Sequence, residues 1–573
     1  MTTVNLDGLT QEQNQEFNTI AKDVRADYDR LIVNLSEEHL DNIHWIVGSI
    51  ASRNKYSSPL FIRCCQIVFV KRLLTQSDPV GEILTGDLAL ATVLKKWCED
   101  HKITGTVIHC SESTKTRVWR ILRPVRQYLV AVYFMALRCL GSAFRAKKTL
   151  PDKPITLIDT FVLNNGGADE GSIRDGVYKD RYYPSLMEQL TEEEKSSIFY
   201  IPTNVGFNNP IKAFSLIRSA TSPFIIHDDY LKLTDYFLAL KHPFKLLRCS
   251  MVNSEFHGVD IMPLLFEERL NHCSDFASLL GILYHQFAFR LQESGVKVRL
   301  LVEWYENQVI DRGMIVGFHK YLPDTKVIGY QGYVISKSLH LYVYPNSSEY
   351  RSKAVPDIVY VVGQGLKNDL HEFCNDVVVA VGPAFRFNKL WRDRAYNPDP
   401  NFFTILVGLP IGLDDCAHIL KLFASILKKF KGTNCQFWIK PHPTYGPESI
   451  KALLPGEWPK EFIFQKGDFH AVIERSNLLV SNASSVSLEA LAKGVPAIIV
   501  APQNGVVQNP IPETISNDAW SIVYNSTELE NEIIRYKEFT TAHKDYFDQL
   551  SLDVRENFFN PVSRENTLKF LEL

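Results

Sequence analysis

The sequence predicts an α/β protein with two Rossmann-like, doubly wound domains in tandem, preceded by a helical extension. Between residues 155 and 383, short apolar runs of strand length are mostly separated by helical stretches. The same alternation restarts after the polar stretch 392–401, which contains two prolines and reads as a linker. Continuous apolar strands alternating with helices are typical of a parallel sheet covered by helices on both faces.

Bulk properties are those of an ordinary globular protein. The 573 residues are 45% hydrophobic and 22% charged, which suggests two to four domains. The net charge of -3 predicts no nucleic-acid partner. Ten cysteines without a CxxC pair favour reduced thiols in a cytosolic protein over zinc or disulfides. The first residues lack the order of a signal peptide, and no apolar run reaches the roughly 20 residues that a membrane-spanning helix needs.

The changes of pattern divide the chain into four predicted regions. Residues 1–114 are expected to be mainly helical, because "EEHLDNIHWIVGSIASRN" and "GDLALATVLKKWCEDHK" space their apolar residues by three and four. The segment "TGTVIHC" predicts one short strand there. Residues 115–150 are a basic segment, residues 151–392 a first Rossmann-like domain, and residues 393–573 a second one with C-terminal helices.

The basic segment contains nine Lys or Arg and no Asp or Glu between Lys115 and Lys148. One interpretation is a core helix with a solvated basic flank. The interpretation we favour is an amphipathic helix lying in the plane of a membrane, because so many cations without a counter-charge are costly to pack against protein. The residues expected to contact the membrane are Arg117, Arg120, Arg123, Arg126 and Trp119.

A histidine stands between two prolines in "FWIKPHP", where a predicted buried strand ends. The prolines stop the strand and hold His442 at its carboxyl end, the place where ligands bind in open α/β sheets. A rigid imidazole there can donate a hydrogen bond to a phosphate or carry a positive charge beside it. The alternative is a turn histidine bonded to the backbone.

A group of small polar residues lies between the next strand and a helix that ends near Gly494, in "NLLVSNASSVSLEALAKG". Asn482, Ser484 and Ser485 precede that helix, and its free N–H groups and dipole favour anions. Plain helix capping is the alternative. Glu489, in the first turns, is either a ligand for a ribose hydroxyl or an ordinary exposed glutamate.

The order strand, His-Pro, strand, Ser-Ser, helix and "KGVPAII" resembles the donor domain of GT-B glycosyltransferases. More narrowly, it resembles members that use cytidine nucleotides: bacterial sialyltransferases and Kdo transferases with HP and SS motifs, and teichoic-acid glycerophosphotransferases. "LLVEWYENQVIDRGMIVGFHKYLPDTKVIGYQGYV" and "YKDRYYPSL" resemble surface-carbohydrate transferases of Gram-negative bacteria. The resemblance covers roughly residues 155–525.

This resemblance implies the GT-B fold, with two Rossmann-like domains facing each other across a cleft and CMP as the leaving group. It places His442, Ser484 and Ser485 on the nucleotide phosphate. Other residues expected beside the nucleotide are Pro443, Lys440, Asn482, Glu489 and the backbone at Gly408.

Carboxylates that follow apolar runs of the first domain are the catalytic candidates: Glu303 after "VRLLV", and Asp228 and Asp229 after "PFIIH". Such a group can act as a general base or attack the anomeric carbon. The alternatives are a cap on the following helix for the aspartates and a salt bridge from Glu303 to Arg312. Arg312 and Gln331 are expected to neighbour the substrate.

A polar, glycine-rich loop at residues 164–184 is assigned to acceptor binding or closure. Lys179 and Arg181 in it are expected to meet a sugar carboxylate or a lipid-linked phosphate, or else to be solvated charges. No DxD motif lies in a suitable loop, so neither a metal nor a cofactor is expected. The donor itself is the CMP-linked sugar.

The sequence therefore predicts a glycosyltransferase of class EC 2.4. It would move Kdo or another nonulosonic acid from a CMP-linked donor to a lipid-linked lipopolysaccharide O-antigen or capsule glycan. It is expected in the cytoplasm, peripheral on the inner face of a bacterial inner membrane. The alternatives are a CDP-glycerol or CDP-ribitol phosphotransferase, a UDP- or GDP-sugar transferase, and a non-catalytic envelope-assembly scaffold with a decayed nucleotide fold.

Overall fold

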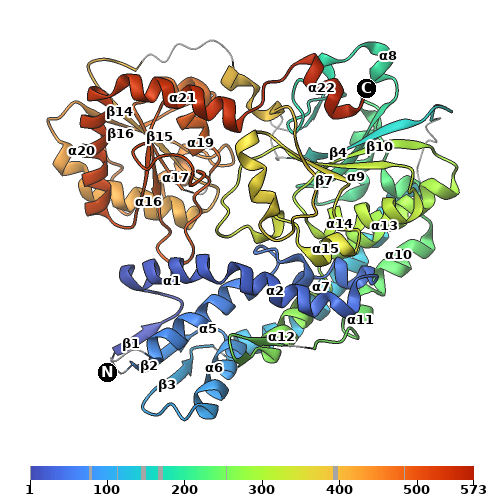
Figure 1. Cartoon of the computed structure of the whole chain (residues 1–573), viewed down its shortest axis with the longest axis horizontal. Coiled ribbons are helices and arrows are strands. Elements are labelled where there is room, and N and C mark those ends of the chain that lie inside the picture. Colours follow the sequence, from blue (N-terminus) through green and yellow to red (C-terminus); the bar gives the residue numbers. More distant parts are fainter. Residues whose placement is uncertain are drawn as a thin grey trace.

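The computed structural model describes residues 2–75, 80–112, 114–143, 150–164, 172–252, 254–391, 398–482 and 484–573. Its two large lobes lie side by side above an N-terminal domain, which runs beneath both of them (Figure 1). The predicted linker lies partly outside the described residues, because residues 392–397 are not among them.

The first Rossmann-like domain contains a six-stranded sheet in the order β13-β12-β11-β10-β4-β7, with every pairing parallel. Its strands are β4 (Ile155–Leu163), β7 (Ile198–Val205), β10 (Val298–Trp304), β11 (Lys326–Gln331), β12 (Ile358–Val361) and β13 (Val379–Val381). The apolar run at 222–229 forms no strand. Its residues Phe224, Ile225 and Ile226 are buried in the core, so their apolarity reflects packing.

Two helices of this domain, α13 (Phe276–Glu293) and α14 (Val309–Tyr321), approach each other closely. A Cβ added at Gly313 would stand 2.1 Å from the carbonyl oxygen of Gly281, so the contact requires glycine. This packing places the start of α14 directly after β10, beside the carboxyl edge of the sheet.

The second Rossmann-like domain also has a six-stranded parallel sheet, in the order β16-β15-β14-β17-β18-β19. Its strands are β14 (Phe403–Gly408), β15 (Cys435–Lys440), β16 (Phe462–Phe464), β17 (Leu478–Ser481), β18 (Ala497–Val500) and β19 (Trp520–Val523). The main covering helices are α16 (Leu413–Ile426) and α20 (Ser526–Ala542). The predicted α/β class with two Rossmann-like, doubly wound domains is confirmed.

The N-terminal domain contains more strand than predicted. A three-stranded parallel sheet joins β1 (Thr2–Asn5), β2 (Val80–Thr85) and β3 (Val107–Cys110). It packs with α1 (Gln11–Asp23), α2 (Arg25–Ser36), α5 (Leu60–Thr75) and α6 (Leu88–Asp100). A later segment completes its core, including the hairpin β8–β9 (Glu255–Phe256, Val259–Asp260) and α12 (Met262–His272). The predicted region 1–114 is therefore a mixed α/β domain that borrows residues from the next region.

The basic segment forms one long helix, α7 (Thr114–Ala143). Among the described residues, no helix is both long enough and apolar enough to cross a membrane.

The C-terminus does not stay with the second domain. After α21 (Lys544–Phe558) the chain crosses to the first domain and ends in α22 (Arg564–Leu571), which lies at the upper right of Figure 1. The ring of Phe570 packs on those of Tyr330 and Tyr360, and Arg299 donates to the carbonyl oxygen of Leu571 at 3.1 Å. The predicted boundary of 393–573 is therefore wrong for the last residues.

Candidate functional site

The carboxyl edges of the two sheets meet. Ser338, in the loop after β11, donates its hydroxyl hydrogen to the carbonyl oxygen of Val507 at 2.6 Å, in the loop after β18. A turn of the N-terminal domain touches both sides: Lys55 Nζ lies 2.8 Å from Gln508 Oε1, and the Tyr56 hydroxyl lies 3.3 Å from His340 Nε2. Side chains from both Rossmann-like domains therefore gather around one region, with the N-terminal domain as a third wall.

The strand order of the second sheet reverses at β14, which pairs with β15 on one side and β17 on the other. Its last residue, Gly408, lies in register with Lys440 and Ser481. Such a reversal is where ligands bind in open α/β sheets. His442 follows β15 and Ser484–Ser485 follow β17. Because β14 lies between these two strands, the two groups flank β14. Two strand spacings, about 10 Å, separate those strands, and a ligand touching both groups would lie across Gly408.

The imidazole of His442 is oriented by its own turn. The backbone N–H of Thr444 donates to Nδ1 at 3.3 Å, and the Thr444 hydroxyl lies 2.8 Å from the same nitrogen. Since Nδ1 accepts, the hydrogen of the neutral ring is on Nε2, which makes no hydrogen bond among the described residues. Partial burial lowers the pKa of His442 below its ordinary value. In the free protein His442 is therefore a neutral hydrogen-bond donor.

The serines after β17 lie at the start of α19 (Val486–Leu491), where Ser485 is the N-cap residue but its side chain makes no capping hydrogen bond. Ser484 Oγ accepts from the N–H of Val486 at 3.5 Å, where the helix begins. Ser485 donates to Glu489 Oε1 at 3.1 Å, and the other oxygen of Glu489 lies 3.4 Å from His470 Nε2. Glu489 is buried, so it is not the exposed glutamate considered as an alternative. Because α19 has only six residues, its dipole is small, and an anion here would depend on hydroxyl and backbone donors.

The other residues expected beside the nucleotide lie at different depths. Asn482 is buried, and Ser481 Oγ, also buried, lies 2.8 Å from Ser487 Oγ. Pro443 is exposed. Lys440 Nζ donates to the carbonyl oxygen of Gly467 at 2.6 Å, and partial burial lowers its pKa. Lys440 is thus held at the same edge as His442.

Two glutamates near the end of β10 have different surroundings. Glu303 is 0% exposed, and neither of its carboxyl oxygens has a hydrogen-bond partner within the described part of the chain. Burial raises its pKa well above the ordinary value, which favours the protonated form. Glu306 is only partly buried, and its two oxygens accept from Trp304 Nε1 at 2.9 Å and Gln308 Nε2 at 2.5 Å. Glu306 is therefore the glutamate that a ligand can reach.

A tight turn holds Glu306 beyond the end of the strand. Asn307 adopts a left-handed conformation with φ of 55°. The N–H groups of Glu306 and Gln308 both donate to Asp311 Oδ2, at 2.9 and 3.0 Å, where α14 begins. The position of Glu306, between the end of a strand and the start of a helix, could have identified it from the sequence. Glu303 was predicted instead because it lies at the end of the apolar run.

Aromatic side chains surround Glu306. The Tyr182 and Trp304 ring centroids lie 4.7 Å apart, and the Arg386 guanidinium lies 5.7 Å from the Trp304 ring centroid. Burial, and secondarily Glu306, raises the pKa of Tyr56. A carboxylate beside aromatic rings suits a polyhydroxylated ligand, because the rings supply apolar area and the carboxylate accepts from hydroxyls. Tyr56, Tyr182 and Arg386 were not predicted as site residues, because no motif marks any of them individually in the sequence alone.

The two aspartates predicted to be catalytic, Asp228 and Asp229, are each paired with an arginine. Asp228 is fully buried, accepts from Arg138 Nε at 3.0 Å and from the Tyr236 hydroxyl at 2.8 Å. Burial opposes its ionisation, yet Arg138 and its other partners keep its pKa below the ordinary value. Asp229 forms an ion pair with Arg218. Both carboxylates join helices of the first domain, so neither has a free side for a substrate, and neither caps α10 (Leu233–Leu240).

Two residues predicted to neighbour the substrate, Arg312 and Gln331, are buried and bonded to other parts of the protein. Arg312 is 0% exposed, with Nη2 2.5 Å from Glu349 Oε1 and Nη1 2.7 Å from the carbonyl oxygen of Ala51. Its acidic partner is thus Glu349 and not Glu303, and it joins the N-terminal domain to the first Rossmann-like domain. Gln331 is buried and donates to the carbonyl oxygen of Val343 at 2.8 Å.

Lys179 and Arg181 are exposed at the surface of the first domain. Residues 165–171 of their loop lie outside the described residues. The described remainder forms a short hairpin, β5 (Ile173–Arg174) with β6 (Val177–Tyr178).

The arginines of α7 have different partners. Arg120 pairs with Glu112 and, at 3.2 Å, with Glu267 of α12, so the assumption that the basic residues lack counter-charges was wrong for it. Arg123 and Arg126 make no hydrogen bond or ion pair with the described residues. Trp119 is exposed. The side chain of Arg117 lies outside the described residues.

No three His, Cys, Asp or Glu side chains of the described residues are grouped to hold a metal ion. The ten cysteines form no disulfide.

No protein-family model matches this chain, and no curated protein matches it. Solved structures with similar architecture include a putative UDP-N-acetylglucosamine 2-epimerase from Listeria monocytogenes, with 10% identity, coverage of 73% of this chain and 95% of that one, and a TM-score of 0.40. MurG from Acinetobacter baumannii has 12% identity, coverage of 73% and 99%, and a TM-score of 0.37. The wall teichoic acid polymerase TagF, solved with CDPG, has 11% identity, coverage of 80% and 97%, and a TM-score of 0.37. At these scores the similarities do not decide the substrate or the reaction.

Proposed function

We propose that this protein is a nucleotide-dependent glycosyltransferase whose donor nucleotide lies across the end of β14. The observation that carries the proposal is the meeting of the two carboxyl edges, shown by the contact between Ser338 and Val507. It brings the strand-order reversal of the second sheet and the carboxylate of Glu306 to the same region. A donor site and an acceptor site on facing edges are what a transfer reaction needs.

The nucleotide phosphates would lie over Gly408, between His442 and Ser484–Ser485. The Nε2–H of His442 is directed by the Thr444 contacts and would donate to a phosphate oxygen. As the nucleotide leaves, its phosphate gains negative charge, and a fixed donor stabilises that charge more than the charge of the ground state.

Glu306 would act as the general base. Its two hydrogen bonds, from Trp304 and Gln308, hold the carboxylate in one orientation. An acceptor hydroxyl bound beside Tyr182 and Trp304 would give its proton to Glu306 while the oxygen attacks the anomeric carbon.

For the donor we propose a CMP-linked acidic sugar, Kdo or another nonulosonic acid, on the strength of the HP and SS motifs. For the acceptor we propose a lipid-linked lipopolysaccharide O-antigen or capsule glycan. The protein would work in the cytoplasm, peripheral on the inner face of a bacterial inner membrane. The exposed apolar residues of α7, such as Trp119 and Leu129, support this location.

The test is nucleotide-induced thermal stabilisation with CMP, CDP, UDP and GDP, followed by nucleotide release from the corresponding donors. We expect CMP to stabilise the parent protein more than the His442→Ala variant at the same CMP concentration, and a CMP-linked sugar to turn over. Preferential turnover of CDP-glycerol, or of a UDP- or GDP-sugar, would replace the donor assignment. No stabilisation by any nucleotide would overturn the enzyme proposal in favour of a scaffold.

A further inference from the structure

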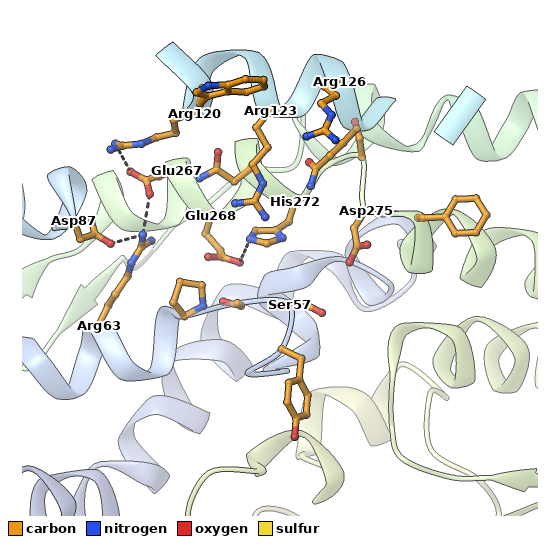
Figure 2. A pocket seen from close by; sticks show the side chains of 18 of the residues that line it. Ser57, Arg63, Asp87, Arg120, Arg123, Arg126, Glu267, Glu268, His272 and Asp275 are labelled. Carbon is orange, nitrogen blue, oxygen red and sulfur yellow. Dashed lines mark hydrogen bonds and ion pairs between the residues drawn. The ribbon is translucent and has the colours of Figure 1, made fainter. Parts of the chain in front are cut away.

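A cavity of about 900 Å³ lies apart from the end of β14. Its walls are α7, α12 and the segment 55–63, which leads into α5. Figure 2 shows Arg120, Arg123 and Arg126 projecting from α7 into this space, above the acidic residues of α12. The cavity is therefore a polar space beneath three arginines.

The cations of this cavity fall into two groups. Arg63 and Arg120 share Glu267, at 2.8 and 3.2 Å, so both are compensated. Arg123 and Arg126 have no such partner among the described residues, and both are exposed. Since they are three residues apart on one helix, they lie on the same side of it. A phosphate group would supply the charge and the several acceptor oxygens that two guanidinium groups need.

The acidic residues of the wall carry less charge than their number suggests. Burial raises the pKa of Glu268 to about 7 and raises that of Asp275. Burial, followed by Arg123, lowers the pKa of His272 to about 4, so this histidine is neutral. The charge of Glu268 is therefore reduced near pH 7, whereas Arg123 acts against burial to lower the pKa of Asp275.

An apolar surface lies beside the two arginines on the same helix. We call it the α7 stripe; its residues recur every three to seven positions and are each at least half exposed. They are Leu122, Val125, Leu129, Tyr133 and Leu140. Val130 and Phe276 line both the arginine cavity and a smaller, mainly apolar cavity of about 270 Å³. Apolar surface adjoining unpaired arginines matches the boundary between lipid chains and anionic headgroups.

We propose that this cavity binds the phosphate or diphosphate head of a lipid through Arg123 and Arg126, while the lipid chain lies on the α7 stripe. The identity of that lipid as the acceptor carrier rests on the proposed transferase function. Tyr56 supports the connection, because it lines the cavity and also lies near Glu306. A glycan attached to the phosphate would extend from the arginines past Tyr56 towards the candidate base.

The test is vesicle co-sedimentation of the full chain with phosphatidylcholine alone and with about one-fifth phosphatidic acid, a phosphomonoester lipid. The variant Arg123→Gln/Arg126→Gln should lose about tenfold in affinity for the phosphatidic acid vesicles and little for phosphatidylcholine alone. The matched control is Lys421→Gln/Lys428→Gln, which removes the same charge from exposed positions of the second domain and should bind like the parent. Leu122→Gln/Leu129→Gln should weaken binding to both kinds of vesicle.

Parental binding by the double arginine variant, or an equal loss in the lysine control, would overturn the proposal. Inorganic pyrophosphate is the soluble probe. If it bound the parent through Arg123 and Arg126 as tightly as the vesicles did, the site would belong to a free phosphate compound and the lipid assignment would be overturned.

Nucleotide stabilisation of the double arginine variant separates this inference from the proposed function. The variant should keep the response of the parent to CMP, because neither arginine is among the residues placed beside the end of β14. Selective lipid binding without any nucleotide response would leave the site standing and remove the transferase. The reverse result would leave the transferase and remove the site.

Discussion

Replacing Glu306 with Gln is the most direct test of the proposed chemistry. The glutamine keeps the size of the side chain, but its amide can offer an oxygen to only one of the two present donors, Trp304 Nε1 or Gln308 Nε2. Losing one hydrogen bond to a charged acceptor costs about 2 kcal/mol of folding free energy. Losing a general base should lower turnover by about 10² to 10⁴, which is about 3 to 5 kcal/mol of activation free energy. The variant should therefore fold and be nearly inactive.

Glu303→Gln is the matched control, because Glu303 lies on β10 three residues before Glu306. Because burial favours the protonated form of Glu303, an amide of the same shape preserves its charge state, and turnover per folded molecule should stay within about threefold. The assay is the initial rate of nucleotide release at saturating donor, with the melting temperature as a check on folding. A near-parental rate for Glu306→Gln together with a hundredfold loss for Glu303→Gln would refute the assignment.

Three further predictions concern the nucleotide site and the scaffold. His442→Ala should weaken nucleotide binding about tenfold by calorimetry, the loss of one charge-assisted hydrogen bond, and an unchanged dissociation constant would contradict that contact. Arg312→Met should reduce stability by about 3 to 5 kcal/mol in urea unfolding, because it removes one of the two arginines that pair with the buried Glu349 and leaves that carboxylate to Arg53 and the N–H groups of Asn307 and Asn346; a change below about 1 kcal/mol would show the network to be dispensable. Burial lowers the pKa of His227 to about 4, so its contribution to stability is complete above its unfolded pKa near 6.5 and is lost as pH falls towards 4. His227→Gln should flatten this part of the stability profile, and an unchanged profile would count against it.

Local sequence patterns were enough to predict most strands of the two large sheets and the class of fold. The runs that became β4, β10 and β14 are apolar over their whole length, because each lies in a sheet covered on both faces. The prolines around His442 likewise determine the position of the imidazole within a few residues. The apolar run at 222–229 also has the composition of a strand, but it forms only a single β-bridge, between Phe224 and Tyr200 of β7.

Pairing with residues distant in the chain decided which charged side chains remain open to a ligand. Arg138 occupies Asp228 from 90 positions away, and Glu349 occupies Arg312 from 37 positions away. Neither pairing is visible in the periodicity of its own segment, so Asp228 was predicted to be catalytic and Arg312 to neighbour the substrate. Glu267 likewise compensates Arg120 from a helix that the sequence assigns to another domain.

By itself, the sequence determined the repeated alternation of strand and helix and the chemistry at each strand end, since both depend on neighbouring residues. Only the tertiary structure decided the strand order around β14, the meeting of the carboxyl edges and the choice of Glu306 over Glu303. These depend on which distant segments pack together, and burial then sets whether a carboxyl group is charged, paired or open to a ligand.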